Sequence, residues 1–165
     1  MKHIIIAGFL IINYAAHCQE DEWANWDANY AEVDIAKLFE YEVAYADSID
    51  NDSSAIKFYA RQKGYRFEGI FTGNTRTLSE DRRMAMKSVY KLHRGEHEIF
   101  DSIEIEIELI VHGERVLWMP IQKQIESYFK EEIGDQESVY LYCTFFNKHE
   151  PNGKLYNLFL ISEFR

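Results

Sequence analysis

The clearest pattern along the chain is a strict alternation of apolar and acidic residues near its middle. Residues 103–109 alternate isoleucine or leucine with glutamate, which is the period of a strand with one buried face. Residues 112–114, His-Gly-Glu, predict a tight reversal, and residues 115–119 return as a second strand that Pro120 ends. This part of the chain is therefore expected to form a β-hairpin.

A helix and two further strands are expected after the hairpin. Residues 121–133 place apolar side chains on one helical face and stop at Gly134. Residues 139–147 and 154–164 then have strand composition, and the turn formers proline, asparagine and glycine lie between them.

The pattern near the N-terminus is less regular. Residues 29–49 carry apolar side chains at helical spacing and many alanines, so we expect a helix there, with Asp27 or Asn29 as its cap. Residues 39–45 also fit a strand period, which leaves a strand as the alternative.

Two strands and a helix are expected between this segment and the hairpin. Residues 56–60 and 65–71 have strand composition, and Lys63-Gly64 is expected to separate them. Residues 77–80, Thr-Leu-Ser-Glu, form a capping box that is expected to open a helix running to about Arg94, before Gly95.

The order strand, strand, strand, helix, strand, strand, with residues 65–73 as the first strand, resembles an oligonucleotide/oligosaccharide-binding (OB) barrel. The resemblance covers roughly residues 65–164, and the helix from Ser79 to Arg94 is an insertion into the usual pattern. Three segments, residues 118–122, the later Tyr-Leu-Tyr strand and the closing residues 161–164, also make the chain similar to exported bacterial OB-like domains of unknown function. We therefore expect an α+β protein, a small OB-like antiparallel β-barrel with an N-terminal helical arm and an inserted helix. The resemblance implies location and fold, and it carries no activity.

The first residues are typical of an export signal. Lys2 is followed by an apolar run, and Ala16-His17-Cys18 provides a small-x-small cleavage site. The expected organisation is a signal peptide at 1–18, an acidic helical arm at 19–52 and the barrel domain at 53–165, with no transmembrane segment after signal removal. The mature protein would be periplasmic or extracellular. Acylation of Cys18, which would give a lipid-anchored protein, is the alternative.

Composition and charge refine this view. The 165 residues are 47% hydrophobic and carry a net charge of −10, which suits one folded domain and disfavours nucleic acid as a partner. The charge comes in blocks, because residues 19–52 hold eleven acids and one base, residues 53–94 ten bases and three acids, and residues 95–165 fourteen acids and six bases. We expect the basic block to fold against the acidic ones. Cys143 lies among apolar residues and is expected in the core.

Basic and aromatic residues alternate between Lys57 and Phe67, a combination that single-strand-binding surfaces use. The candidate binding residues in this stretch are Lys57, Tyr59, Arg61 and Arg66. The other interpretation places the aromatic residues in the core and pairs the basic ones with the acidic arm. Trp23 and Trp26 are candidates for a contact surface or a carbohydrate platform, or they pack on the barrel.

Metal chemistry has two weak candidates. Glu104, Glu106 and Glu108 share one strand face and could hold calcium, but a solvated face opposite the basic inserted helix is the simpler interpretation. His93 and His97 have a spacing found in zinc sites, but Gly95 between them favours a cationic helix end followed by a loop. His149 is expected in a turn without a role, and no cofactor is expected.

Three functions remain open on the sequence. The first is an exported, non-enzymatic binding or interaction domain with a protein or glycan partner at the cell envelope. The second is an inhibitor or immunity-type protein that blocks a secreted enzyme or toxin with its acidic surface. The third is an envelope hydrolase that uses carboxylates.

Overall fold

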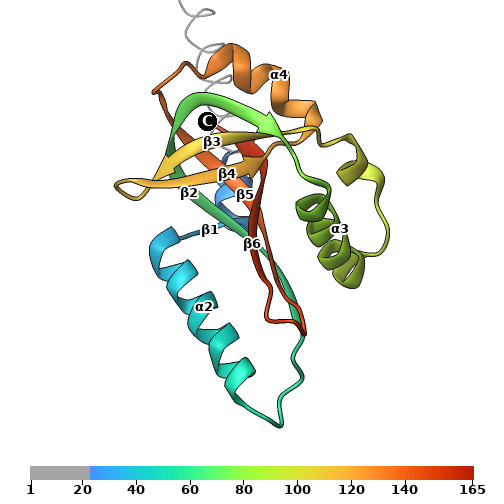
Figure 1. Ribbon diagram of the computed structural model, residues 1–165. Coiled ribbons are helices and arrows are strands. Elements are labelled where there is room, and N and C mark those ends of the chain that lie inside the picture. Colours follow the sequence, from blue (N-terminus) through green and yellow to red (C-terminus); the bar gives the residue numbers. More distant parts are fainter. Residues whose placement is uncertain (1–22) are drawn as a thin grey trace, which may run out of the picture.

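The structure, a computed structural model, describes residues 23–165 and is α+β, as expected (Figure 1). A helical turn at residues 23–29 precedes the other elements. These are β1 (Ala31–Glu32), α2 (Ile35–Asn51), β2 (Tyr59–Thr77), α3 (Glu80–Arg94), the 3-10 helix η1 (Glu98–Ser102), β3 (Ile105–Val111), β4 (Arg115–Pro120), α4 (Lys123–Glu132), β5 (Ser138–His149) and β6 (Leu155–Phe164). The expected signal peptide and Cys18 lie outside the described residues.

The strands form one curled sheet in the order β4-β3-β2-β5-β6, with every pair in this path antiparallel. The long strand β2 belongs to both halves, because residues 59–70 pair with β5 and residues 70–77 pair with β3. Its ladder with β3 shifts register between Phe71 and Thr75, where Gly73 has a φ of +86° that favours glycine. This bulge bends β2, and a parallel bridge from Ile121 to Ile161 brings the end of β4 beside β6. The result is a half-barrel.

The middle of β2 corrects the expectation of two separate strands. Lys63 lies opposite Phe145 and Gly64 opposite Thr144, so both residues belong to an unbroken ladder. A Cβ atom at Gly64 would lie only 3.0 Å from the carbonyl oxygen of Asn29. The glycine is therefore present because another segment crosses β2 closely, and it makes no turn.

The helix starts also differ from the sequence prediction. The carboxylate of Asp34 accepts hydrogen bonds from the backbone N–H groups of Ala36 and Lys37, so α2 begins later than residue 29. Residues 39–45 lie within α2, which excludes the strand alternative for them. Thr77 ends β2 and makes no cap, because Ser79 is the N-cap of α3. The end of α3 at Gly95, which has a φ of +88°, is confirmed.

The core fills the concave side of the half-barrel. Phe129 of α4 is fully buried, and its ring centroid lies 5.3 Å from that of Phe71 and 5.0 Å from that of Phe164. Ile35 and Leu38 of α2 join the same cluster, so the arm packs against the sheet. Each such side chain stabilises the fold by about 1.5–3 kcal/mol through removal from water. Cys143 lies in this core as expected, and burial raises the pKa of its thiol.

A second apolar cluster joins α3 to the outer face of the sheet. Met86 and Val89 of α3 pack with Phe146 of β5 and with Phe100 of η1, and all four side chains are almost completely buried. The inserted helix is thereby fixed on the convex side, next to the middle of β2. Its C-terminal end, at His93 and Arg94, forms one wall of the site described next.

Candidate functional site

Lys57 and Arg61, two of the candidate binding residues, contact α2. The Lys57 ammonium donates to the backbone carbonyls of Asp50 and Asp52 at 2.8 and 2.7 Å. The Arg61 guanidinium pairs with the Glu42 carboxylate at 2.9 Å. Burial raises the pKa of Glu42, while Arg61 acts in the opposite direction.

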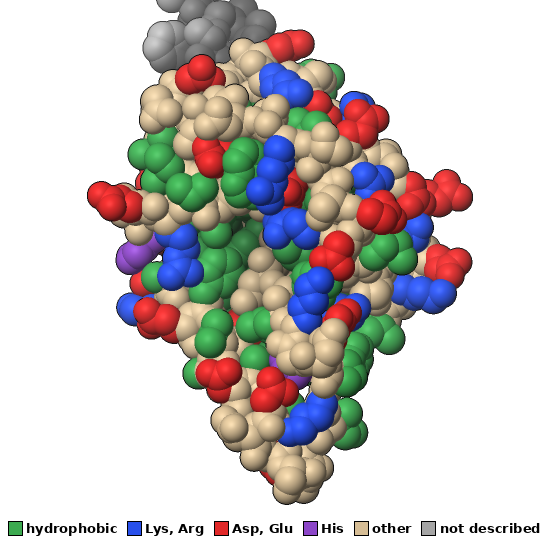
Figure 2. Space-filling model, in the orientation of Figure 1, with side chains coloured by type: hydrophobic (Ala, Val, Ile, Leu, Met, Phe, Trp, Pro, Cys, Tyr) green, Lys and Arg blue, Asp and Glu red, His purple; other side chains and the backbone are tan. Residues whose placement is uncertain are grey.

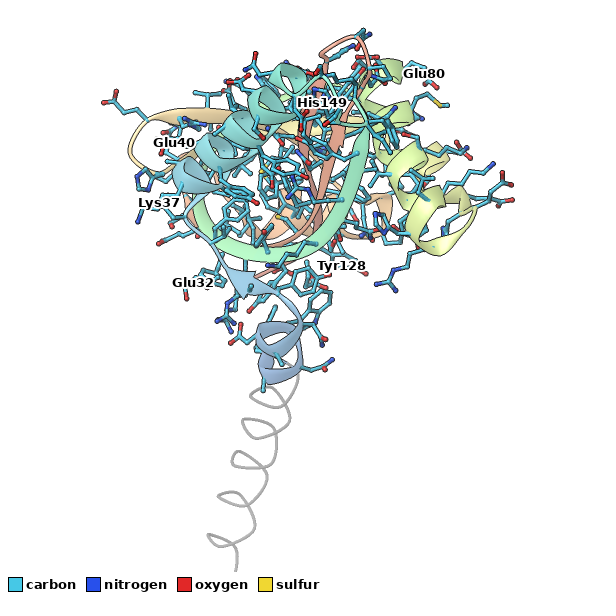
Figure 3. The ribbon with its side chains drawn as sticks, turned by 90° about the horizontal axis from the view of Figure 1, so that it is seen from below. Glu32, Lys37, Glu40, Glu80, Tyr128 and His149 are labelled. Atoms are coloured by element: carbon cyan, nitrogen blue, oxygen red, sulfur yellow. The ribbon has the colours of Figure 1, made fainter. Side chains whose placement is uncertain are left out.

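The Arg61 guanidinium also lies 4.4 Å from the ring centroid of Tyr45 and 4.8 Å from that of Tyr59. Tyr59 in turn stacks on the buried His149, whose Nε2 lies 3.1 Å from a carboxylate oxygen of Asp50. Figure 3 labels His149 beside the C-terminal end of α2, where Asp50 lies. The expectation that His149 lies in a turn is therefore wrong, because β5 continues to this residue, where its ring is buried and contacts Asp50 of α2.

Arg66 contacts the segment before β1. Its guanidinium pairs with Asp27, whose carboxylate also accepts a hydrogen bond of 2.7 Å from the hydroxyl of Tyr142. This hydrogen bond is the main reason that the pKa of Asp27 is lowered, whereas burial, with the Asp27 contact, raises the pKa of Tyr142 to about 12. The basic residues thus meet the acidic arm, as the alternative interpretation of the Lys57–Phe67 stretch predicts.

Trp23 and Trp26 are half-buried against the outer face of β5. Their ring centroids each lie 5.5 Å from that of Tyr142. Packing on the barrel, one of the two readings of these residues, is what the structure shows. Both indoles also line a groove beside α4, which is considered below.

The expectation that Glu104, Glu106 and Glu108 form a solvated face is wrong for Glu106. Glu106 is only 1% exposed, and its two carboxylate oxygens accept hydrogen bonds of 2.7 and 2.6 Å from Arg76 and Arg82. Glu104 pairs instead with Lys123, and Glu108 accepts hydrogen bonds from β2. The three carboxylates therefore have three separate sets of partners. The inserted helix α3 lies opposite this face, as expected, but Glu106 is buried beneath Arg82 and Arg76 instead of being solvated.

The histidine pair does not converge. His93 Nε2 lies 3.2 Å from the carbonyl oxygen of Ala60, and His97 Nδ1 accepts from the N–H of Ile99 at the start of η1. Among residues 23–165, no group of three or more His, Cys, Asp or Glu side chains is arranged to hold a metal ion.

A hollow lies between α3 and the segment before β1, and we call it the Arg94 hollow. Its volume is about 600 Å³, and its lining contains no carboxylate. It is lined by Asn29, Tyr30, Gln62, Lys63, Gly64, His93, Arg94 and Thr144.

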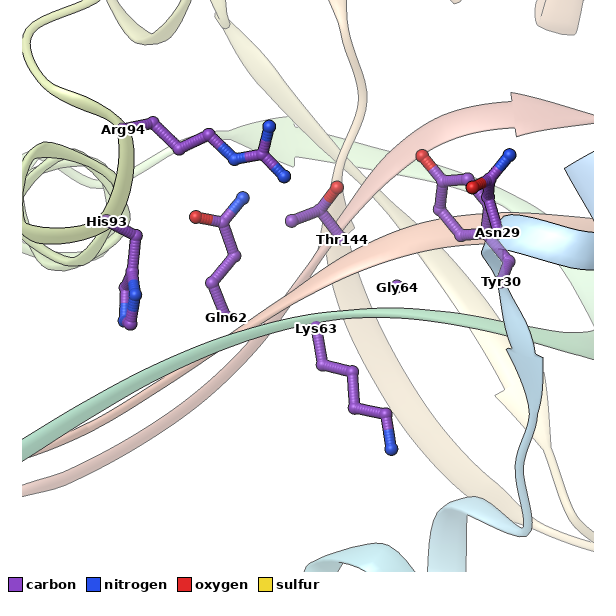
Figure 4. Close-up of a pocket in the computed structure, with 8 residues that line it drawn as sticks. All are labelled: Asn29, Tyr30, Gln62, Lys63, Gly64, His93, Arg94 and Thr144. Atoms are coloured by element: carbon purple, nitrogen blue, oxygen red, sulfur yellow. The ribbon is translucent and has the colours of Figure 1, made fainter.

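The floor of the Arg94 hollow is the outer face of the sheet. Successive residues of a strand point to opposite faces of the sheet, so Gln62 and Gly64 are on the outer face and Lys63 is on the opposite face. Figure 4 shows the Lys63 side chain on the other side of the strand, while Arg94 reaches over Gln62 toward Thr144. The amide oxygen of Gln62 is buried and has no hydrogen-bond partner among the described residues.

Arg94 has an unusual position among the cations. Every other Lys or Arg side chain of residues 23–165 lies against a carboxylate, a backbone carbonyl or an aromatic ring. Figure 2 shows the same interspersed arrangement of acidic and basic side chains over one face of the molecule. The hollow thus combines a guanidinium that has no partner in this part of the chain with a buried, unsatisfied acceptor. Such a combination can bind a ligand that carries both an anion and a hydroxyl donor.

No protein-family model, no curated protein and no solved structure matches this chain. The described part of the chain also has no helix that is long and apolar enough to cross a membrane. The class that can be stated is therefore an α+β protein with a half-barrel sheet and a polar hollow on its convex side.

Of the residues that line the Arg94 hollow, only His93 is among the candidates that the sequence pattern indicates, and there for a different chemistry. Gln62 and Arg94 belong to segments that were recognised, but nothing local distinguishes them from other polar surface residues. Gly64 was the available signal, because a glycine within a strand pattern can mark a close backbone approach. We interpreted it as part of a break between strands, which hid the crossing of Asn29 over β2.

Proposed function

We propose that this protein is an exported, non-enzymatic binding domain that takes an acidic sugar in the Arg94 hollow. The observation that carries the proposal is the unpartnered guanidinium of Arg94 above the unsatisfied amide oxygen of Gln62. In a protein with a net charge of −10, a hollow lined by basic and neutral polar residues is matched to an anion.

The two groups demand different things from a ligand. The Arg94 guanidinium presents a planar fork of donors that fits a carboxylate. The Gln62 oxygen needs a donor, which a sugar hydroxyl supplies. An inorganic anion without a proton to donate, such as chloride or sulfate, would leave Gln62 unsatisfied, and a neutral sugar would leave Arg94 unpaired. A uronic acid carries both functions on one ring.

The remaining lining supports a sugar-sized ligand. Tyr30, Asn29 and Thr144 add side chains able to form hydrogen bonds, and the Thr144 hydroxyl is 3.2 Å from that of Ser162. A volume of about 600 Å³ lies within the usual range of small-ligand sites, roughly 300–1,000 Å³.

Fold and location form part of the same proposal. Three features support an OB-like barrel: the order of the strands, the parallel bridge that brings β4 to β6, and the position of α4 between β4 and β5. Export rests on the sequence of residues 1–18. A glycan ligand fits a protein that works at the cell envelope.

Calorimetric titration of the full chain with a short oligogalacturonate tests the proposal. We expect saturable binding that weakens as salt is added, because the charged partner is close to solvent. A neutral malto-oligosaccharide of equal length is expected to bind much more weakly. Arg94→Gln is expected to weaken oligogalacturonate binding about tenfold, the effect of losing one charge-assisted hydrogen-bond pair.

Arg115→Gln is the matched control. Arg115 likewise has no carboxylate partner among the described residues, but its guanidinium lies 5.2 Å from the ring centroid of Phe39, away from the hollow. It should leave the affinity unchanged. Equal weakening by both variants would show that only the overall charge matters, and absence of binding at low salt would overturn the proposal.

A further inference from the structure

A second hollow lies on the opposite side of the segment before β1, beside α4, and we call it the Trp23 groove. Its volume is about 350 Å³, and it lies against the last residues of β6. It is lined by Trp23, Trp26, Ile125, Tyr128, Glu132, Glu163 and Phe164. Four of these seven side chains are aromatic and two are carboxylates, which differs completely from the lining of the Arg94 hollow.

The side chains that line the Trp23 groove come from three elements: the helical turn of residues 23–29, α4 and β6. Ile125, Tyr128 and Glu132 are separated by three and four residues on α4, which places them on one helical face. Tyr128 is 58% exposed, and Figure 3 shows it beside the helical turn of residues 23–29. Both indoles are supported from behind by Tyr142, so the rings are fixed before a ligand arrives.

The charge of the Trp23 groove is negative. Neither Glu132 nor Glu163 forms an ion pair with another residue of the described chain, and no Lys, Arg or His is among the lining residues. The guanidinium of Arg165 lies 5.2 Å from the ring centroid of Trp23. Asp27 lies 3.6 Å from Arg165 and partly neutralises it.

We infer that the Trp23 groove binds a quaternary ammonium group such as the trimethylammonium of choline. Aromatic faces attract cations through their quadrupoles, and the two carboxylates add a net attraction. The two carboxylates would attract any cation, so the preference for a quaternary ammonium comes from the four aromatic side chains, whose faces suit a weakly hydrated cation. A trimethylammonium group is weakly hydrated and presents methyl groups that fit Ile125 and Phe164.

The test is a titration of the full chain with choline, in which binding is monitored through the indole N–H signals in NMR spectra. The signals of Trp23 and Trp26 are expected to shift together and to saturate. Trp118 is an internal reference, because it lies outside the groove, 4.3 Å from the guanidinium of Arg76. Dimethylbutanol, the neutral carbon analogue of choline, and methylammonium are expected to bind more weakly.

Variants on α4 separate ring and charge. Tyr128→Leu keeps apolar bulk and is expected to weaken choline binding about two- to fivefold, the effect of one exposed cation–π contact. Glu132→Gln is expected to weaken it by a similar factor, whereas Glu131→Gln, an exposed neighbour outside the groove, should not.

Three results would overturn the inference: equal binding of choline and dimethylbutanol, equal binding of choline and methylammonium, or equal effects of the two glutamate variants. The inference is independent of the acidic-sugar proposal, because the Trp23 groove and the Arg94 hollow share no lining residue. Arg94→Gln should therefore leave choline binding unchanged.

Discussion

Replacing Glu106 with glutamine is expected to destabilise the protein far more than its place in an alternating strand suggests. Glu106 is 1% exposed, and each of its oxygens accepts a hydrogen bond from one guanidinium, at 2.7 Å from Arg76 and 2.6 Å from Arg82. Glutamine has almost the same shape but no charge. Its NH₂ group would face a guanidinium donor, so one of the two hydrogen bonds is lost and both guanidinium groups lose their counter-charge.

The magnitude follows from burial on each side of the pair. Removing one partner of a buried ion pair costs about 3–5 kcal/mol when the other partner stays buried. Here the side chains of Arg76 and Arg82 are 44% and 26% exposed, so water can take over part of their solvation. We therefore expect a loss of about 2–3 kcal/mol in the free energy of unfolding. For a chain of this size that corresponds to a decrease of roughly 8 °C in Tm.

Urea denaturation followed by circular dichroism measures this loss, with Glu104→Gln as the matched control. Glu104 lies two residues away, and it pairs with Lys123 at 2.9 Å where both side chains are well exposed. Its replacement should leave the unfolding free energy unchanged within error. The reasoning fails if the two variants lose equal stability, or if Glu106→Gln loses less than about 0.5 kcal/mol.

Two further predictions concern the segment that crosses β2. Gly64→Ala would place a Cβ atom 3.0 Å from the Asn29 carbonyl oxygen and 3.1 Å from the Tyr30 ring, so it should loosen this segment and cost about 1–3 kcal/mol by thermal melting; an unchanged Tm would contradict the crossing. Because the pKa of Tyr142 is raised to about 12 in the folded protein, its contribution to stability is complete below pH 10 and is lost between about pH 10 and 12. Tyr142→Phe should flatten this alkaline fall in unfolding free energy, and an equally steep fall in the variant would refute the assignment.

The C-terminal half of the fold could be predicted from the sequence because its signals are local. The alternation at residues 103–109, the reversal at His112-Gly113 and the apolar face of residues 121–133 each fix an element from neighbours in the chain. The observed strands and helix begin and end within two residues of these expectations. Positive φ values at His112 and Gly113 confirm the tight turn.

The errors arose where distant segments decide the outcome. An alternating pattern shows that Glu106 and Ile107 face opposite sides, but it does not show what covers the second side. The basic inserted helix is expected opposite that side, and Arg82 of α3 confirms this, but neither the contact with Arg76 nor the burial of Glu106 follows from the pattern. Gly64 was misread for the same reason, because the segment it accommodates is more than thirty residues away in the sequence.

The block pattern of charge explains why Arg94 has no carboxylate partner among the described residues. The basic block folds against acidic residues on both sides, through contacts such as Arg61 with Glu42 and Arg82 with Glu106. Such ion pairs form wherever acidic residues of the arm or of residues 95–165 lie close to the basic block. Arg94 lies at the end of α3, where the arm presents only Asn29 and Tyr30 across the floor of the hollow. No carboxylate lines this hollow, so the acidic residues of the described chain would compete little with the carboxylate of the proposed ligand there.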